Sequence, residues 1–193
     1  NACIIHRLAQ ISQTITVRIE ADQMSNVRGR PCTSITLPGD TPMNIVVTGG
    51  TGFVGRALCA SLSDSGHHIV ILTRNAGAVL RVLGTNMTTV EWNGRDRGTW
   101  EESLEGADAV INLAGEPIAA GRWTKERKQF IVESRVNATQ LLARAIPPAS
   151  SRPRVFISAS GVGYYGTSPD RRFDERDGPG SDFFADLCRS WEG

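Results

Sequence analysis

Three glycines with the spacing G-x-x-G-x-x-G, at positions 49, 52 and 55, are the part of this sequence with the clearest chemistry. The apolar run Ile45–Val47 before them predicts a buried strand, and the amphipathic run Val54–Leu62 after them predicts a helix. In such a unit Gly49 can adopt backbone angles that a Cβ forbids, Gly52 lets a pyrophosphate approach the main chain, and Gly55 lets the helix pack closely on the strand. The helix would offer free N–H groups and its positive dipole end to phosphates. The pattern predicts dinucleotide binding, with a purely structural turn as the alternative. The candidate cofactor-binding residues here are Gly49, Gly50, Thr51, Gly52, Phe53, Val54 and Gly55.

The end of the second predicted strand, His68–Thr73, indicates which cofactor is bound. At this point of a nucleotide-binding fold a carboxylate bonds the ribose 2′-OH of NAD, whereas an arginine pairs with the 2′-phosphate of NADP. Arg74 follows the strand, and no acid stands there. We therefore predict NADP, with NAD as second choice. A solvated surface arginine is the alternative reading of Arg74.

Two further strands are predicted over Asp108–Gly115 and Val155–Ser160, and the first of them ends in small residues. Small side chains at the end of that strand leave room for a nucleotide; the alternative is a strand that simply stops at a glycine. Glu116 follows the first of these strands and could face substrate, or it could be an ordinary loop acid. The cofactor-binding candidates at these two strand ends are Leu113, Ala114, Gly115 and Ser158.

The elements that must position these residues alternate between strands and helices. Besides those named, the pattern predicts a short helix over Ala76–Leu83, a strand over Thr88–Trp92 and a helical or loop segment over Trp100–Leu104. One long helix is predicted from a Thr124 cap to about Ile146, and another helix starts at Asp182. The alternation predicts a Rossmann-like, doubly wound parallel sheet, and right-handed crossovers order its strands 3-2-1-4-5.

The composition excludes several classes of function. The chain has 21 Lys and Arg against 20 Asp and Glu, so it lacks the excess of positive charge that binding to nucleic acid or an anionic membrane requires. No apolar run approaches the ~20 residues that a membrane-spanning helix needs. The four cysteines are scattered without ligand spacing, so we predict no metal site and a reducing, cytoplasmic location. The three histidines, His6, His67 and His68, lie far from the candidate site in sequence.

Residues 1–42 do not share the pattern that follows. The sequence begins at Asn1, and Met43 stands where a native start would fall. We expect 1–42 to be a poorly ordered or foreign extension and 43–193 to be the NAD(P)-binding domain. The extension keeps an organellar location open.

Seven strings occur in order: MNIVVTGGTGFVGRALCASL, TRN, DAVINLAGEPIA, RWTKERK, SRVNATQLL, ISASGVGYYGTS and DFFADLCRSWEG. Over about residues 43–193 they resemble the epimerase-family proteins of the atypical short-chain dehydrogenase/reductase superfamily, related to NAD-dependent epimerase/dehydratases. The resemblance implies a Rossmann domain followed by a smaller C-terminal substrate domain, with this chain stopping before the last strands and that domain. It also implies a homodimer of the full-length protein and a small-molecule substrate that the sequence does not identify.

In extended members of that superfamily, a Ser, a Tyr and a Lys four residues after the Tyr carry the chemistry. The serine position falls on Ser160, with Gly161 as the competing alignment, whereas the Tyr and Lys positions fall on Phe184 and Cys188. Phenylalanine has no proton to exchange, and a thiol supplies no fixed positive charge, so the acid/base of an enzyme must be another group. Our catalytic candidates are Ser160, Tyr164, Tyr165 and Glu116.

Two functions follow from this sequence. The first is NADP-dependent hydride transfer on a small carbonyl or sugar-nucleotide-type substrate. The second, favoured by the missing Tyr–Lys pair, is a nucleotide-binding regulatory or scaffold protein that senses NADP(H) without turnover.

Overall fold

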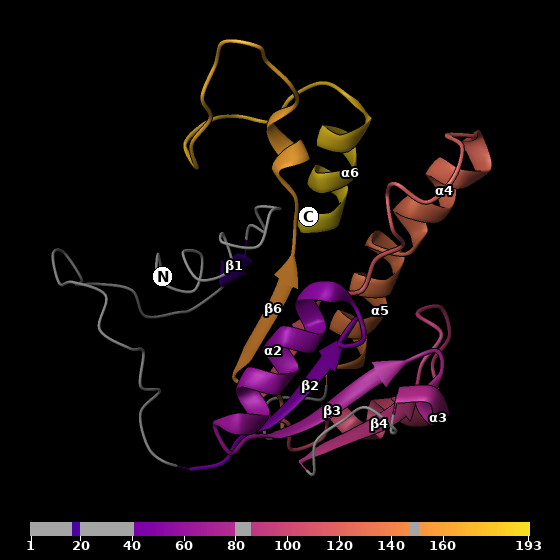
Figure 1. The fold of residues 1–193 in the computed structure, drawn as a ribbon, viewed down its shortest axis with the longest axis vertical. Helices are drawn as coiled ribbons and strands as arrows, with labels where there is room; N and C mark the ends of the chain where they lie inside the picture. Colours follow the sequence, from indigo (N-terminus) through magenta and orange to yellow (C-terminus); the bar gives the residue numbers. More distant parts are fainter. Residues whose placement is uncertain (1–16, 20–40, 80–85, 147–150) are drawn as a thin grey trace, which may run out of the picture.

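The computed structural model describes residues 17–19, 41–79, 86–146 and 151–193, which form a six-stranded sheet with helices on both faces (Figure 1). The strands lie in the order β1-β6-β5-β2-β3-β4. Five of them are parallel: β2 (Asn44–Thr48), β3 (His68–Thr73), β4 (Met87–Glu91), β5 (Ala109–Asn112) and β6 (Val155–Ala159). Counted from β2, these five strands have the predicted order 3-2-1-4-5, which confirms the Rossmann-like fold class.

The sixth strand comes from the N-terminal stretch. β1 (Val17–Ile19) pairs antiparallel with β6, so that Val17 lies opposite Ala159. The remainder of that stretch, 1–16 and 20–40, lies outside the described residues. The predicted domain division into 1–42 and 43–193 stays a prediction.

The apolar runs form strands because side chains on alternate positions can be buried on opposite faces of the sheet. Val46 of the central strand packs in one core with Leu72, Val110 and Leu142. Its neighbours Ile45 and Val47 pack in the other core, and Cys59 joins them from the helix that crosses this face. Both faces are therefore covered, as a parallel sheet requires.

The first core lies under α5 (Val136–Ala145) and the short helix η1 (Thr99–Leu104), and the second lies under α2 (Phe53–Asp64). α3 (Ala76–Val79) covers the first part of the predicted helix over 76–83, and residues 80–85 lie outside the described ranges. Near the carboxyl end of β6 lie the short helix η2 (Val162–Tyr165) and α6 (Phe183–Glu192) (Figure 1). Asp182 starts α6 by accepting hydrogen bonds from the N–H groups of Phe184 and Ala185.

The prediction of one helix over 124–146 was wrong. Thr124 does cap a helix, but α4 (Lys125–Glu133) ends at a bend, after which α5 begins. At the bend the Ser134 hydroxyl donates to the Ile131 carbonyl at 2.9 Å and accepts the Glu116 N–H at 3.1 Å. A serine that bonds back to its own helix and also holds a neighbouring loop bends the helix at that point.

The fourth predicted strand, 108–115, is shorter than expected. The Leu113 N–H still donates to the Thr48 carbonyl, but the Ala114 N–H donates to the Thr48 hydroxyl instead. Because a side chain replaces the backbone acceptor there, the ladder of β5 ends at Asn112 and the chain is free to turn over the sheet edge.

Candidate functional site

The glycine corner between β2 and α2 is built so tightly that side chains would not fit. Gly49 has φ +67°, and a Cβ on it would lie 2.6 Å from the Leu113 carbonyl oxygen. A Cβ on Gly55 would lie 2.2 Å from the Gly49 carbonyl oxygen and 2.7 Å from Gly50 Cα. The Gly52 N–H closes the turn by donating to the Gly49 carbonyl at 3.0 Å. The corner therefore holds the start of α2 directly against the end of β2.

The first turn of α2 presents its amides at this corner. Gly52 occupies the N-cap position, and none of the described side chains bonds the amides there. The helix is 12 residues long and therefore has a substantial dipole. This dipole and the free N–H groups of the first turn favour an anionic group at this end. A pyrophosphate therefore fits this corner.

A groove of about 330 Å³ runs from the glycine corner along the carboxyl edge of the sheet. Eight residues predicted from the sequence line it: Gly49, Thr51, Gly52, Arg74, Leu113, Ala114, Gly115 and Glu116. The structure thus brings the ends of β2, β3 and β5 together at one groove.

The other cofactor-binding candidates do not line this groove. A Cβ on Gly50 would face Ile71 and Cys59 in the core, and Gly55 lies beneath the turn. Val54 follows Phe53 in α2, and Phe53 is 79% exposed. Ser158 lines a different, larger cavity.

The sequence did not predict the residues that line the groove after β4 and from helices α4 and α5. Trp92 is buried, and its Nε1–H has no hydrogen-bond partner among the residues described. Arg95, three residues on, lies with its Cζ 5.1 Å from the centre of the Phe130 ring. The residues after β4 could have been predicted, because β4 lies next to β3 and the carboxyl ends of parallel strands meet at one edge of the sheet. The missed lining residues are Trp92, Asn93, Gly94, Arg95, Phe130, Glu133, Ser134 and Ala138.

A buried asparagine connects the strand ends with the helices. Asn112 accepts a hydrogen bond from the Thr48 hydroxyl at 2.6 Å. Its amide donates to the hydroxyls of Thr139 at 2.8 Å and of Ser158 at 3.3 Å. The Thr139 hydroxyl in turn accepts the Trp191 Nε1–H at 2.8 Å. One continuous network thus runs from β2 through β5 and α5 to α6.

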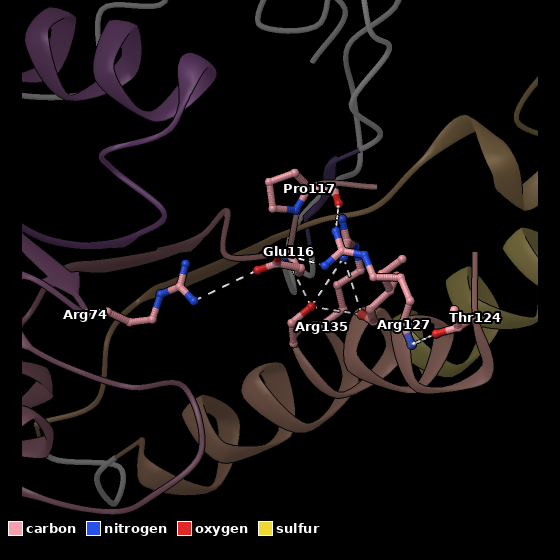
Figure 2. Close-up of polar contacts among 8 residues, drawn as sticks. Arg74, Glu116, Pro117, Thr124, Arg127 and Arg135 are labelled. Carbon is pink, nitrogen blue, oxygen red and sulfur yellow. Dashed lines mark hydrogen bonds and ion pairs between the residues drawn. The ribbon is translucent and has the colours of Figure 1, made fainter. Parts of the chain in front are cut away.

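Glu116, a catalytic candidate, lines the groove and is also ion-paired (Figure 2). Its carboxylate contacts Arg127 at 3.0 Å, and the two side chains are only 16% and 17% exposed. Arg74 lies 3.9 Å from the other carboxylate oxygen and is 72% exposed. Arg127 also donates to the Pro117 carbonyl. The Glu116 side chain is thus held by Arg127 and lies close to Arg74, and its catalytic role stays a prediction.

Arg135, at the bend between α4 and α5, is a second buried arginine near this pair (Figure 2). Its Nη1 donates to the Ile131 carbonyl at 3.3 Å and to the Ser134 hydroxyl at 3.4 Å. Its Cζ lies 5.4 Å from the centre of the Trp191 ring. Burial lowers the pKa of the Arg135 guanidinium, while Cys188 and Glu116 act in the opposite direction. No pattern in the sequence distinguishes Arg135 from the arginines on the surface.

Three of the four catalytic candidates, Ser160, Tyr164 and Tyr165, line one cavity of about 1140 Å³ together with Ser158 and Trp191. The Ser160 hydroxyl donates to the Glu192 carboxylate. The Tyr165 ring stacks on Phe173 at 5.6 Å. Burial, followed by the charge of Glu175, raises the pKa of the Tyr165 hydroxyl, which moves that pKa further from neutral pH. The candidate roles of these residues stay predictions.

Phe184 and Cys188, which stand at the positions of the Tyr–Lys pair, pack against neighbouring residues in the structure. The Phe184 ring meets the Trp123 ring edge-on at 5.4 Å, and a Cβ on Gly163 would lie 2.8 Å from Phe184 Cβ. The buried Cys188 thiol donates to the Gly161 carbonyl at 3.5 Å, and burial raises its pKa. A buried thiol with a raised pKa remains protonated and unreactive.

Comparison with known proteins adds sequence and structural relatives. Residues 45–183 match the NAD-dependent epimerase/dehydratase family. The epimerase family protein YfhF of Bacillus subtilis is 42% identical over 151 residues, which are 78% of this chain and 48% of that protein. A chloroplastic epimerase family protein of Arabidopsis thaliana, an SDR39U1 homologue, is 38% identical over 80% of this chain and 44% of its own length.

Among solved structures, the human epimerase family protein SDR39U1 with NADPH superposes with a TM-score of 0.61 at 34% identity, covering 78% of this chain and 48% of the human one. The chain thus spans about half the length of the curated relatives it matches. None of the helices that the structure describes is long and apolar enough to cross a membrane.

Proposed function

Because this chain belongs to the NAD-dependent epimerase/dehydratase family, within the atypical short-chain dehydrogenase/reductase superfamily, we propose that it binds NADP at the glycine corner and uses it for hydride transfer. The substrate class in this proposal is a small carbonyl or sugar-nucleotide-type compound. Residues 43–193 form the nucleotide-binding domain in this proposal.

The observation that carries the proposal is the glycine corner. Side chains at Gly49 and Gly55 would collide with the backbone, so the main chain is left bare at the point where α2 presents its amides. Backbone amides and a helix dipole bind a diphosphate without any charged side chain. A bound nicotinamide would supply the hydride donor or acceptor.

NADP is favoured over NAD by Arg74, which follows β3 at the rim of the groove, where the sequence has no Asp or Glu directly after the strand. The human relative was solved with NADPH, which supports the same choice. NAD is the second choice, because the solved structure of MoeE5, at 25% identity, contains NAD and UDP-glucose.

Replacement of this arginine tests the choice. We expect Arg74→Glu to reduce the ratio of NADPH to NADH affinity by about tenfold to a hundredfold, since a charge-assisted bond to phosphate is worth ~1.5–3 kcal/mol. Dissociation constants for both nucleotides, from cofactor fluorescence, measure the ratio. Arg176→Glu, in the loop before α6, is the matched surface control. An unchanged ratio in Arg74→Glu would show that the 2′-phosphate is held elsewhere.

In the enzymatic reading, Ser160 holds the substrate oxygen, and Tyr164 or Tyr165 exchanges its proton. The two tyrosines share a cavity with Ser160, which supports this assignment. A non-catalytic NADP(H)-binding regulator or scaffold is the second candidate. The observation that favours it is the packing of Phe184 and Cys188, where a Tyr–Lys pair would carry the proton transfer.

The two candidates differ in one experiment on the full-length protein. Both expect NADPH fluorescence to change on binding. If the protein is an enzyme, we expect steady NADPH oxidation with some member of a panel of carbonyl compounds, and we expect Ser160→Ala to lose that oxidation. If the protein is a regulator, we expect it to bind NADPH without oxidising it in the presence of any compound of the panel. Absence of NADPH binding would contradict both.

A further inference from the structure

Arg135 is a buried cation whose charge is not matched by the protein around it. The residue is 8% exposed, and its described hydrogen bonds both come from Nη1. Within 17–19, 41–79, 86–146 and 151–193, no carboxylate lies within ion-pair distance of its guanidinium. Arginine keeps its proton in proteins, so burial does not remove the charge. A buried charge without a partner costs free energy that a bound anion would recover.

The surrounding charges leave a positive surplus. Arg127 and Arg135 are both largely buried, and the charge of Glu116 acts on both of them. Glu116 is already in contact with Arg127 and close to Arg74. Arg74 and Arg127 therefore share the Glu116 carboxylate, and Arg135 lies near this group without an ion pair of its own in the described part of the chain (Figure 2).

Arg135 contacts residues that line two different cavities. A Cβ on Gly115 would lie 3.0 Å from its Cζ and 3.1 Å from its Nη2, so the guanidinium packs closely against this glycine. Gly115 and Ser134 line the nucleotide groove. Trp191, on which the guanidinium stacks, lines the cavity of Ser160. Arg135 thus lies between the nucleotide groove and the cavity that holds the catalytic candidates.

We propose that Arg135 binds a carboxylate of the substrate, so that the substrate class is an anionic carbonyl or hydroxy compound. This inference rests on the proposed function of the groove. The planar guanidinium matches the two oxygens of a carboxylate, and its Nε and Nη2 donate no hydrogen bond within the part of the chain that the structure describes. The pyrophosphate of the cofactor already has its own site at the glycine corner.

The test uses oxalate as the probe and the full-length protein saturated with NADPH. Calorimetry is expected to show oxalate binding that weakens about tenfold to a hundredfold in Arg135→Gln, as expected for loss of a charge-assisted pair, and less in Arg135→Lys. NADPH affinity is expected to stay unchanged in both variants. Arg144→Gln replaces an exposed arginine of α5, the helix that begins directly after Arg135; it is the matched control and is expected to bind oxalate as the wild type does.

A second measurement needs no variant, in case Arg135→Gln does not fold. Phenylglyoxal modifies arginines, and peptide mass spectrometry of the wild type is expected to show that oxalate slows modification at Arg135 and not at Arg144. Inorganic phosphate in place of oxalate is expected to protect less.

Three outcomes would overturn the proposal: no oxalate binding to the wild type, equal oxalate binding in Arg135→Gln, or a loss of NADPH affinity in Arg135→Gln as large as the loss for oxalate. The last would assign the guanidinium to the cofactor. If the wild type does not bind NADPH, the proposed function fails on its own, and oxalate is then titrated against the nucleotide-free chain. Loss of that binding in Arg135→Gln would still support an anion site.

Discussion

The Gly55→Ala variant is expected to bind NADPH about a hundredfold more weakly than the wild type, which corresponds to the loss of two charge-assisted bonds of ~1.5 kcal/mol each. The added Cβ would lie 2.2 Å from the Gly49 carbonyl oxygen and 2.7 Å from Gly50 Cα. Both are backbone atoms and cannot move without displacing the turn. The displaced turn would no longer aim its amides and those of α2 at one diphosphate. Overpacking of this kind also lowers the free energy of unfolding by about 1–3 kcal/mol.

The matched control is Gly77→Ala, because a Cβ on Gly77 in α3 meets nothing within 4 Å. That variant is expected to bind NADPH like the wild type. NADPH fluorescence titration and urea unfolding measure the two effects separately. Wild-type affinity in Gly55→Ala would mean that the diphosphate does not lie on this corner, and the proposed cofactor site would be wrong.

The Asn112→Leu variant is expected to lose about 3 kcal/mol of unfolding free energy, since buried groups left without partners cost ~1–3 kcal/mol each. Asn112 is fully buried and joins Thr48, Thr139 and Ser158 through its side-chain amide. Leucine has nearly the same shape but cannot bond any of them. Some partners keep a second bond, such as Thr139 with Trp191, so the costs do not simply add.

Urea unfolding followed by tryptophan fluorescence measures this loss. Asn44→Leu, at the exposed start of β2, is the control and is expected to change the unfolding free energy by less than about 0.5 kcal/mol. If both variants unfold at the same urea concentration as the wild type, the buried network contributes nothing to stability.

The sequence predicts the sheet well because its strands are short apolar runs in a chain that alternates strictly between strands and helices. β3 has the predicted bounds His68–Thr73, and the five parallel strands have the order 3-2-1-4-5 that is typical of Rossmann folds. The glycine corner was predictable for a related reason. The restrictions on Gly49 and Gly55 come from neighbours within a few residues along the chain and from the strand that must lie beside them.

The rest depends on contacts between distant segments. The apolar stripe of Ile131, Ala138 and Leu142 runs unbroken through the bend at Ser134, so periodicity alone favoured a single helix. The bend is produced by Glu116, which lies 18 positions earlier in the chain. The ion pairing of Glu116 with Arg127 likewise needs the loop after β5 to fold back on α4, which no local pattern reveals.

The bend at Ser134 has a consequence for how two like charges tolerate each other. Arg127 lies on α4, before the bend, and Arg135 lies at it, so the angle between the two helices sets the separation of the two guanidinium groups. That angle is fixed by one hydroxyl, which donates to its own helix and accepts from the Glu116 backbone. The Ser134 hydroxyl thus sets how far apart the guanidinium groups of Arg127 and Arg135 lie, and the strength of their electrostatic repulsion depends on that separation.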